Sequence, residues 1–305
     1  MRERCRDERS RRRWAADLAA VARAHWTEER TLALTGGKRL AVLPAEAPVL
    51  LRALGLLHRD ATMPPAQVRK FLQINHVVRV LEPALAELRA RHPVIRIVDA
   101  GCGRSYLTLL IAWCARERWH HPLEILGVDR NPDVIAECRR RTALAELDDV
   151  VRFEAASLDD VRAADVHAVM ALHACDTATC DAIALGVARG ADLIAVAPCC
   201  QAELARAWSA LAERPGLAAG GFAPIWRTPH LRREIAAHVT DAMRALLLRA
   251  AGYRVTAMEF IAAEHTQKNT LLRAVRAEPD PAARAEYDAL VAATGGCGLA
   301  LAARL

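Results

Sequence analysis

The chain has 305 residues and a mass of 33.3 kDa, enough for one large domain or for a core domain with an added lobe. No apolar run reaches the length of a membrane span, and the hydrophobic content of 53% is ample for a buried core. The net charge of +6 and the pI near 9.0 favour a polyanionic partner such as RNA. Nine scattered cysteines and an arginine-rich start without an apolar leader predict free thiols, a cytoplasmic location and no membrane partner.

The beginning of the chain is dense in arginine: residues 2–13 hold seven arginines against three acids. Two interpretations stand. The segment is a solvated, frayed terminus, with residues 1–13 disordered, or it is an arm that contacts RNA. The rest of the chain is close to neutral, so much of the positive charge lies in this segment.

Residues 1–92 are expected to be helical. Apolar residues recur at helical spacing from Trp14 to Trp26, and Pro64-Pro65 opens a further helix over residues 66–91. Pro83 lies inside that helix. We expect it to split the segment in two, because proline removes a helix hydrogen bond and clashes with the preceding turn.

After His92 the pattern changes to alternating strands and helices, which predicts an α/β fold with a parallel sheet. We expect residues 1–92 to form a helical N-terminal region, residues 93–278 the main domain and residues 279–305 a C-terminal tail. Residues 214–228 are rich in glycine and proline and are expected to form a loop. The predicted strands are 94–99, 123–129, 150–155, 166–172, 191–197, 253–261 and 269–277, and the predicted helices are 106–113, 132–147, 177–189, 201–213, 229–251 and 281–293.

The first strand ends in a turn with the pattern Asp-x-Gly-x-Gly, formed by Asp99, Gly101 and Gly103, and a helix follows. The glycines let the backbone turn tightly and let a ligand approach closely. A carboxylate at the strand end suits the cationic amino group of S-adenosylmethionine (AdoMet) and would repel a pyrophosphate. A nicotinamide-binding unit would also need a third glycine, where this chain has Tyr106. The turn therefore predicts AdoMet as the cofactor.

The ends of the next two strands supply further polar groups. Asp129 closes the second strand, where its carboxylate can accept hydrogen bonds from both ribose hydroxyls. Ser157 and Asp159 follow the third strand, where the adenine amino group would lie. Gln73 and Asn75, in the helix before the first strand, either cover the cofactor or form a solvated face. The layout matches the Rossmann-like, seven-stranded class I methyltransferase sheet with an N-terminal helical extension.

The methyl acceptor is expected at the ends of strands four and five, which flank the sulfonium methyl in this fold. A second loop, residues 264–269, should rise on the same side. The side chains predicted to lie near the chemistry are His173, Cys175, Asp176, Cys199 and Cys200.

Three motifs resemble a known group. They are Asp-x-Gly-x-Gly-x-x-Tyr-Leu from Asp99, Leu-His-Ala-Cys-Asp-x-Ala-Thr from Leu172 and Pro-Cys-Cys from Pro198. Together they are similar to the methyltransferase-like 25 group of AdoMet-dependent enzymes and, more distantly, to the tRNA acceptor-stem 2′-O-methyltransferases. This resemblance, over roughly residues 66–277, implies a class I fold, AdoMet as donor and an RNA acceptor, either tRNA or rRNA. A protein or small-molecule acceptor, and a non-catalytic AdoMet-binding role, remain alternatives.

The acceptor atom stays open. Cys175 with Cys199 or Cys200 could supply the two thiols of a carbon-5 pyrimidine mechanism. Transfer to a hydroxyl or amine needs only a positioned base, such as His173, Asp176 or Lys268. A zinc site built from the histidine and the cysteines is a further interpretation, although no metal is expected. Inert thiols that pack beneath the cofactor are the simplest one.

Overall fold

The structure is a computed structural model that describes residues 8–172, 177–198, 201–214, 222–259 and 270–305. Seven strands form one sheet in the order β3-β2-β1-β4-β5-β7-β6. This order confirms the predicted α/β, Rossmann-like methyltransferase fold. The strands are β1 (Ile95–Ala100), β2 (Leu123–Asp129), β3 (Val151–Ala155), β4 (Ala168–Leu172), β5 (Leu193–Ala197), β6 (Tyr253–Glu259) and β7 (Thr270–Arg276).

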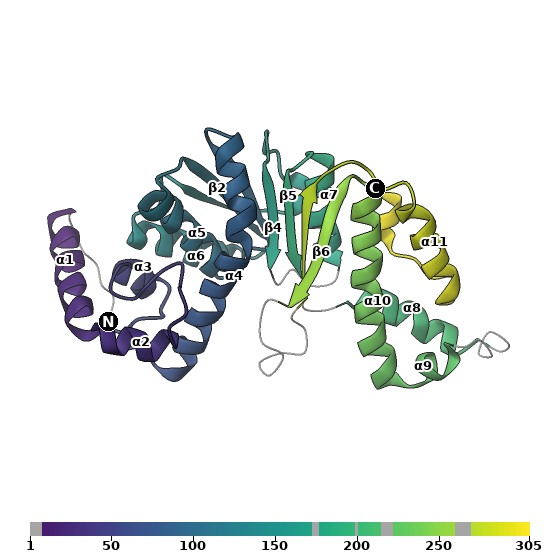
Figure 1. Ribbon diagram of the computed structural model, residues 1–305, viewed down its shortest axis with the longest axis horizontal. Helices are drawn as coiled ribbons and strands as arrows, with labels where there is room; N and C mark the ends of the chain where they lie inside the picture. Colours follow the sequence, from purple (N-terminus) through teal and green to yellow (C-terminus); the bar gives the residue numbers. More distant parts are fainter. Residues whose placement is uncertain (1–7, 173–176, 199–200, 215–221, 260–269) are drawn as a thin grey trace. The chain divides into compact units, whose positions relative to one another are not determined.

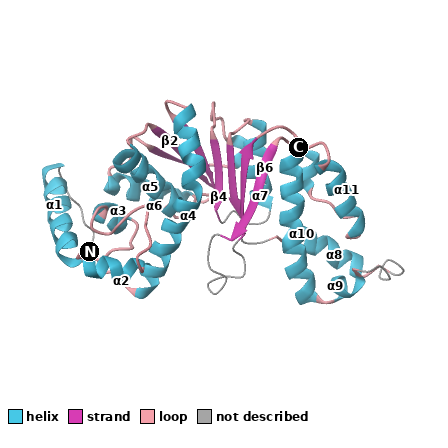
Figure 2. Cartoon of the chain, in the orientation of Figure 1, coloured by secondary structure: helices cyan, strands magenta, loops and turns pink. Residues whose placement is uncertain are grey.

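The centre of the sheet is parallel and its last two strands are antiparallel (Figure 2). Val98 of β1 pairs with Val169 of β4, which pairs with Ile194 of β5. Strand β7 runs antiparallel between β5 and β6, with Leu272 opposite Val196. The strand order reverses between β1 and β4. In open α/β sheets a ligand binds at such a reversal, outside the carboxyl ends of the strands.

The chain divides into two compact units, and the first comprises Met1–Val94, Arg104–Ile125 and Pro132–Phe153. Within it α3 packs against α1, α5 and α6, and α4 packs against α5. A π-helical turn, Ala115–Trp119, continues α5. The helices of this unit are α1 (Glu8–His25), α2 (Glu28–Thr35), α3 (Pro48–Ala53), α4 (Pro65–Arg91), α5 (Tyr106–Cys114) and α6 (Pro132–Ala145).

Two of the N-terminal helices differ from what the sequence predicts. Helix α4 runs without a break through Pro83, so the predicted split is wrong. Burial explains the difference, because Leu81, Ala84 and Leu85 around the proline are all buried and offset the lost hydrogen bond. Helix α1 begins at Glu8 and therefore includes residues 8–13, part of the segment expected to be disordered. Residues 1–7 lie outside the described part of the chain.

The second unit comprises Ile95–Gly103, Leu126–Asn131 and Glu154–Leu305. Its long helix α10 packs against α8, α9, α11 and strand β6 (Figure 1). Buried Trp208, Met243 and Leu247 belong to its core, together with residues of β4, β5 and β7. The helices of this unit are α7 (Thr177–Ala188), α8 (Ala202–Ala212), α9 (Ala223–Arg227), α10 (Pro229–Ala250) and α11 (Ala283–Ala293).

Helix α9 contradicts part of the loop expected over residues 214–228, because residues 223–227 are helical; residues 215–221 lie outside the described part of the chain. Ala223 and Trp226 are buried, and Pro224 lies in the first turn, where proline is compatible with a helix. The apolar pair in a glycine- and proline-rich context was the missed signal. Where the structure describes the chain, no helix is both long and apolar enough to span a membrane.

Candidate functional site

The turn after β1 is held by main-chain hydrogen bonds to the end of β2. The N–H groups of Gly101 and Cys102 both donate to the carbonyl of Val128, at 2.8 and 3.0 Å. Gly101 has φ of +69° and Gly103 of +49°, a left-handed backbone that favours glycine. Asp99 is 5% exposed at the end of β1. The sequence motif thus forms the predicted tight turn at the reversal in strand order.

Asp129 joins this turn to the third strand. Its Oδ2 accepts from the Gly103 N–H at 3.2 Å, and its Oδ1 accepts from the Asn131 N–H at 2.9 Å. Its main-chain carbonyl accepts from the N–H of Ala156 at 3.1 Å. A carboxylate has about four acceptor positions, so two bonds leave capacity for ribose hydroxyls. The residue predicted to bind ribose therefore also shapes the glycine turn.

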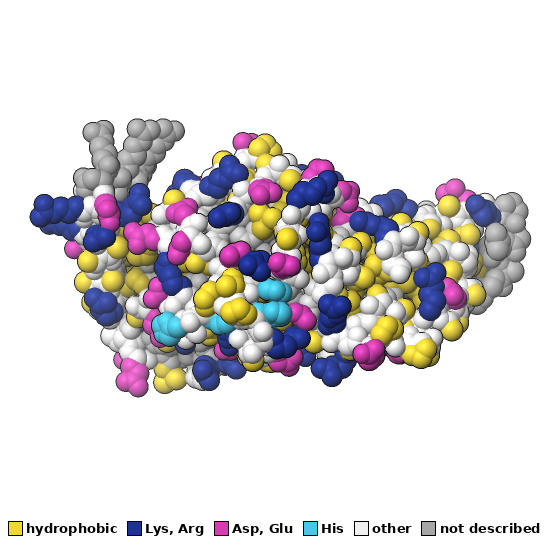
Figure 3. Space-filling model, turned by 90° about the horizontal axis from the view of Figure 1, so that it is seen from above, with side chains coloured by type: hydrophobic (Ala, Val, Ile, Leu, Met, Phe, Trp, Pro, Cys, Tyr) yellow, Lys and Arg dark blue, Asp and Glu magenta, His cyan; other side chains and the backbone are white. Residues whose placement is uncertain are grey.

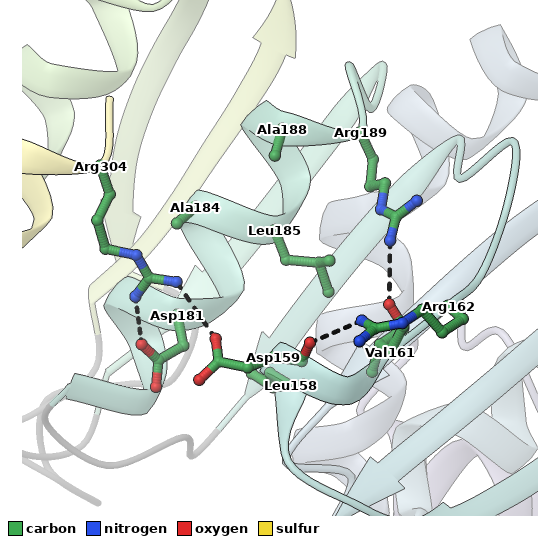
Figure 4. Close-up of a pocket in the computed structure, with 10 residues that line it drawn as sticks. All are labelled: Leu158, Asp159, Val161, Arg162, Asp181, Ala184, Leu185, Ala188, Arg189 and Arg304. Carbon is green, nitrogen blue, oxygen red and sulfur yellow. Dashed lines mark hydrogen bonds and ion pairs between the residues drawn. The ribbon is translucent and has the colours of Figure 1, made fainter.

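Ser157 and Asp159 follow β3, but their side chains have different surroundings. The Ser157 hydroxyl accepts from Arg130 at 3.5 Å. Asp159 is exposed and lies 3.6 Å from Arg304, which also pairs with Asp181 of α7. Figure 4 shows Arg304 pointing toward both carboxylates across a pocket of about 370 Å³. The adenine-binding role of Ser157 and Asp159 stays a prediction.

The side chains predicted to lie near the chemistry fall outside the described part of the chain, and so does the 264–269 loop. The structure therefore brings together Asp99, Gly101, Gly103 and Asp129. It does not test the residues predicted on the acceptor side. Asn75 is buried, and its amide is bonded to the main chain at Val42 and Phe71, at 2.8 and 3.0 Å. Neither the covering role nor the solvated face considered for it fits a side chain so enclosed. The residues outside the described ranges are His173, Cys175, Asp176, Cys199 and Cys200.

A buried polar network that the sequence did not predict lies between α7, α8 and α10. Arg244 is 0% exposed, and it donates to Asp241 at 3.1 Å and to the Cys180 sulfur at 3.3 Å. Gln201, the residue after Cys200, donates to the other Asp241 oxygen at 2.9 Å. Burial raises the pKa of the Asp241 carboxyl, and the Arg244 guanidinium opposes that rise. An acid and an arginine three residues apart, next to the apolar residues Met243, Leu246 and Leu247, were the only sequence signal.

Residues 69–207 match a family model described as a methyltransferase domain. A search of curated proteins finds no match to this chain. Solved structures with a similar fold include the SAH-bound methyltransferase PaMTH1 of Podospora anserina, at 13% identity and a TM-score of 0.47, covering 83% of this chain and 97% of that one. SAM-bound magnesium protoporphyrin IX methyltransferase of Synechocystis is 15% identical, with a TM-score of 0.43 and coverage of 75% and 90%. A putative rRNA methylase of Clostridium thermocellum is 14% identical, with a TM-score of 0.39 and coverage of 66% and 97%.

These structural likenesses are too distant to carry an argument about the acceptor. The family match covers β1 to β5, which include the glycine turn and Asp129. The sheet order and the reversal between β1 and β4 agree with it. Residues 69–207 therefore form a methyltransferase domain, and its glycine turn and Asp129 are the groups expected to hold AdoMet.

Proposed function

We propose that the methyl acceptor is RNA, either tRNA or rRNA. The observation that carries the proposal is the set of exposed arginines on α1, in the segment where the positive charge of the chain is concentrated. Arg9, Arg12, Arg13 and Arg23 are exposed there, against Glu8 and Asp17. Arginine forms strong, planar contacts with phosphate, and phosphate contacts dominate nucleic-acid affinity. The motifs His-Ala-Cys-Asp and Pro-Cys-Cys support the same acceptor by resemblance.

The distribution of charged side chains limits which surfaces could bind RNA. On the face displayed in Figure 3, Lys and Arg side chains are interspersed with Asp and Glu. Mixed signs at that spacing weaken each other's field, so this face offers no single basic stripe. We assign RNA contact chiefly to the arginines of α1, because they belong to the densest run of positive charge in the sequence.

The chemistry proposed at the site is a direct displacement. AdoMet, when bound, supplies an electrophilic methyl group on a sulfonium. In our proposal Asp99 holds the cationic amino group and Asp129 the ribose. His173 or Asp176 takes the proton from the attacking hydroxyl or amine as the carbon–sulfur bond breaks. A thiol of Cys175, Cys199 or Cys200 is the alternative if the acceptor is a pyrimidine carbon.

The test is transfer of labelled methyl from AdoMet into fractionated RNA, protein and small metabolites of a cell extract. We expect label in RNA that ribonuclease removes. Label confined to protein or to small molecules would mean that the acceptor is a protein or a small molecule and not RNA. Binding of AdoMet without transfer to any fraction would favour a non-catalytic role.

A matched pair of variants tests the arginines. Arg9→Gln with Arg13→Gln should weaken RNA binding and lower the slope of log affinity against log salt by about one to two, because each lost phosphate contact contributes about 0.7–0.9. Arg69→Gln with Arg254→Gln removes equal charge from exposed positions outside α1. Equal losses in the two pairs would mean that α1 has no special part in RNA binding.

A further inference from the structure

Side chains of α6 bond to the residues that directly follow the glycine turn and keep them in place. Ser105 has φ of +56°, a left-handed conformation that is strained for any residue with a Cβ, and it is 1% exposed. Its hydroxyl donates to the sulfur of Cys138 on α6 at 2.6 Å. Such a backbone persists only where its surroundings enforce it. The neighbouring contacts identify what does so.

Arg141, one turn further along α6, makes the remaining contacts. It is 8% exposed, and its Nη1 donates to the carbonyl of Arg104 at 2.9 Å. Its Nε donates to Glu137 at 2.9 Å, which fixes the guanidinium from the other side. The guanidinium carbon also lies 5.3 Å from the centre of the Tyr106 ring, and the Lys70 ammonium lies 5.0 Å from it. Arg141 thus contacts the residues on both sides of Ser105.

We propose that Arg141 is a positioning residue for the cofactor. By holding the Arg104 carbonyl and the Tyr106 ring, it fixes the left-handed backbone that follows Gly103. The chain that leaves the glycine turn at Arg104 is thereby fixed before AdoMet arrives, which lowers the ordering cost of binding. The inference rests on AdoMet binding and is independent of whether the acceptor is RNA.

The arginine next to it provides the matched control. Arg140 also bonds Glu137, at 2.7 Å through both Nε and Nη2, but its side chain is 61% exposed whereas that of Arg141 is 9% exposed. Removing either arginine deletes one positive charge and one partner of Glu137. Only removal of Arg141 deletes the bond to the Arg104 carbonyl and the contact with the Tyr106 ring.

The experiment compares two ligands by calorimetry. AdoMet carries the amino-acid end that the glycine turn receives, whereas 5′-methylthioadenosine lacks it and keeps the ribose and adenine. Arg141→Met should weaken AdoMet about tenfold, the size of one lost charge-assisted hydrogen bond, and methylthioadenosine by less than about threefold. Arg140→Met should leave both affinities within about twofold.

Two further measurements separate positioning from general stability. Melting temperatures without ligand will show whether the two variants are equally stable, and low-millimolar guanidinium should restore AdoMet affinity to Arg141→Ala but not change Arg140→Ala. If Arg141→Met does not fold, Arg141→Lys replaces it, because lysine keeps the positive charge but lacks the planar guanidinium with its several N–H donors. The AdoMet affinity of this variant should lie between that of the parent and a tenfold loss. Equal losses for AdoMet and methylthioadenosine, or equal losses in the two arginine positions, would overturn the proposal.

Discussion

The cofactor edge of the sheet and the α7–α8–α10 side are held together by different kinds of contact. At the cofactor edge, main-chain N–H groups of Gly101, Cys102 and Gly103 bond to the end of β2, at most 27 residues away in the chain. On the other side a buried guanidinium joins residues that lie far apart. Arg244 is 64 residues from Cys180, and Asp241 is 40 residues from Gln201.

This difference predicts how each region responds to substitution. The cofactor edge depends on backbone conformation and on one carboxylate, so its variants should lose ligand affinity more than stability. The buried network depends on a desolvated ion pair, so its variants should lose stability first.

Arg244→Met should be the most damaging substitution. It leaves the Asp241 carboxylate buried without its arginine, a situation that costs about 3–5 kcal/mol of folding free energy. Denaturant unfolding would measure the loss. The double variant Arg244→Met with Asp241→Leu should recover much of it, because no charge is then buried alone. If the single variant is as stable as the parent, the ion pair does not hold α7, α8 and α10 together.

Gly103→Val should abolish AdoMet binding by calorimetry. A Cβ at Gly103 would meet nothing closer than the Gly101 carbonyl oxygen at 3.9 Å, so the cost comes from φ of +49°, which a β-branched residue resists, and from the space next to the ligand. Gly36→Val is the control. That glycine has φ of +57° with no atom within 4 Å of a Cβ, and it ends α2. It should lose stability while AdoMet affinity stays unchanged.

Asp129→Ala should weaken AdoMet by about 1.5–3 kcal/mol, because it removes charge-assisted bonds to the ribose and the acceptor of the Gly103 N–H. That is roughly ten- to over a hundredfold in dissociation constant. Asp148→Ala, at an exposed position, serves as the charge control. An unchanged affinity in the Asp129 variant would remove this carboxylate from the cofactor site.

Local patterns made much of the fold and of the cofactor edge predictable. The seven strands lie within a few residues of their predicted bounds, because apolar runs between glycine and proline signals report burial directly. Asp99, the two glycines and Asp129 could be placed because they lie at or directly after the ends of β1 and β2, and parallel strand ends meet at one edge. The predicted acceptor residues are not described by the structure and stay predictions.

What the sequence did not reveal depends on tertiary contacts. Helix α4 continues through Pro83 because the residues next to this proline are buried. The spacing of apolar residues alone does not predict that burial. Ser105 adopts a left-handed backbone with α6 residues contacting it, and no local pattern marks such a serine. Arg141 and Arg244 look like surface arginines in the sequence. Only the packing around them shows that they are buried.

Acid pH should change the stability of the fold only slightly, through the carboxylate of Glu137. Hydrogen bonds from Arg140, and then from Arg141, lower the pKa of Glu137 to about 2. Because the folded pKa lies below the unfolded value of about 4.3, Glu137 stabilises the fold above that value, and the contribution is lost as pH falls toward 2. The carboxylate is 38% exposed, so solvent screens the pair and the change is modest.

The melting temperature should therefore fall more steeply between about pH 5 and pH 3 in the parent than in Glu137→Gln. Glu154→Gln, which removes an equal charge from an exposed position on β3, should keep the parent's slope. Identical slopes in the parent and in Glu137→Gln would mean that the arginine pair does not hold this carboxylate in its charged form.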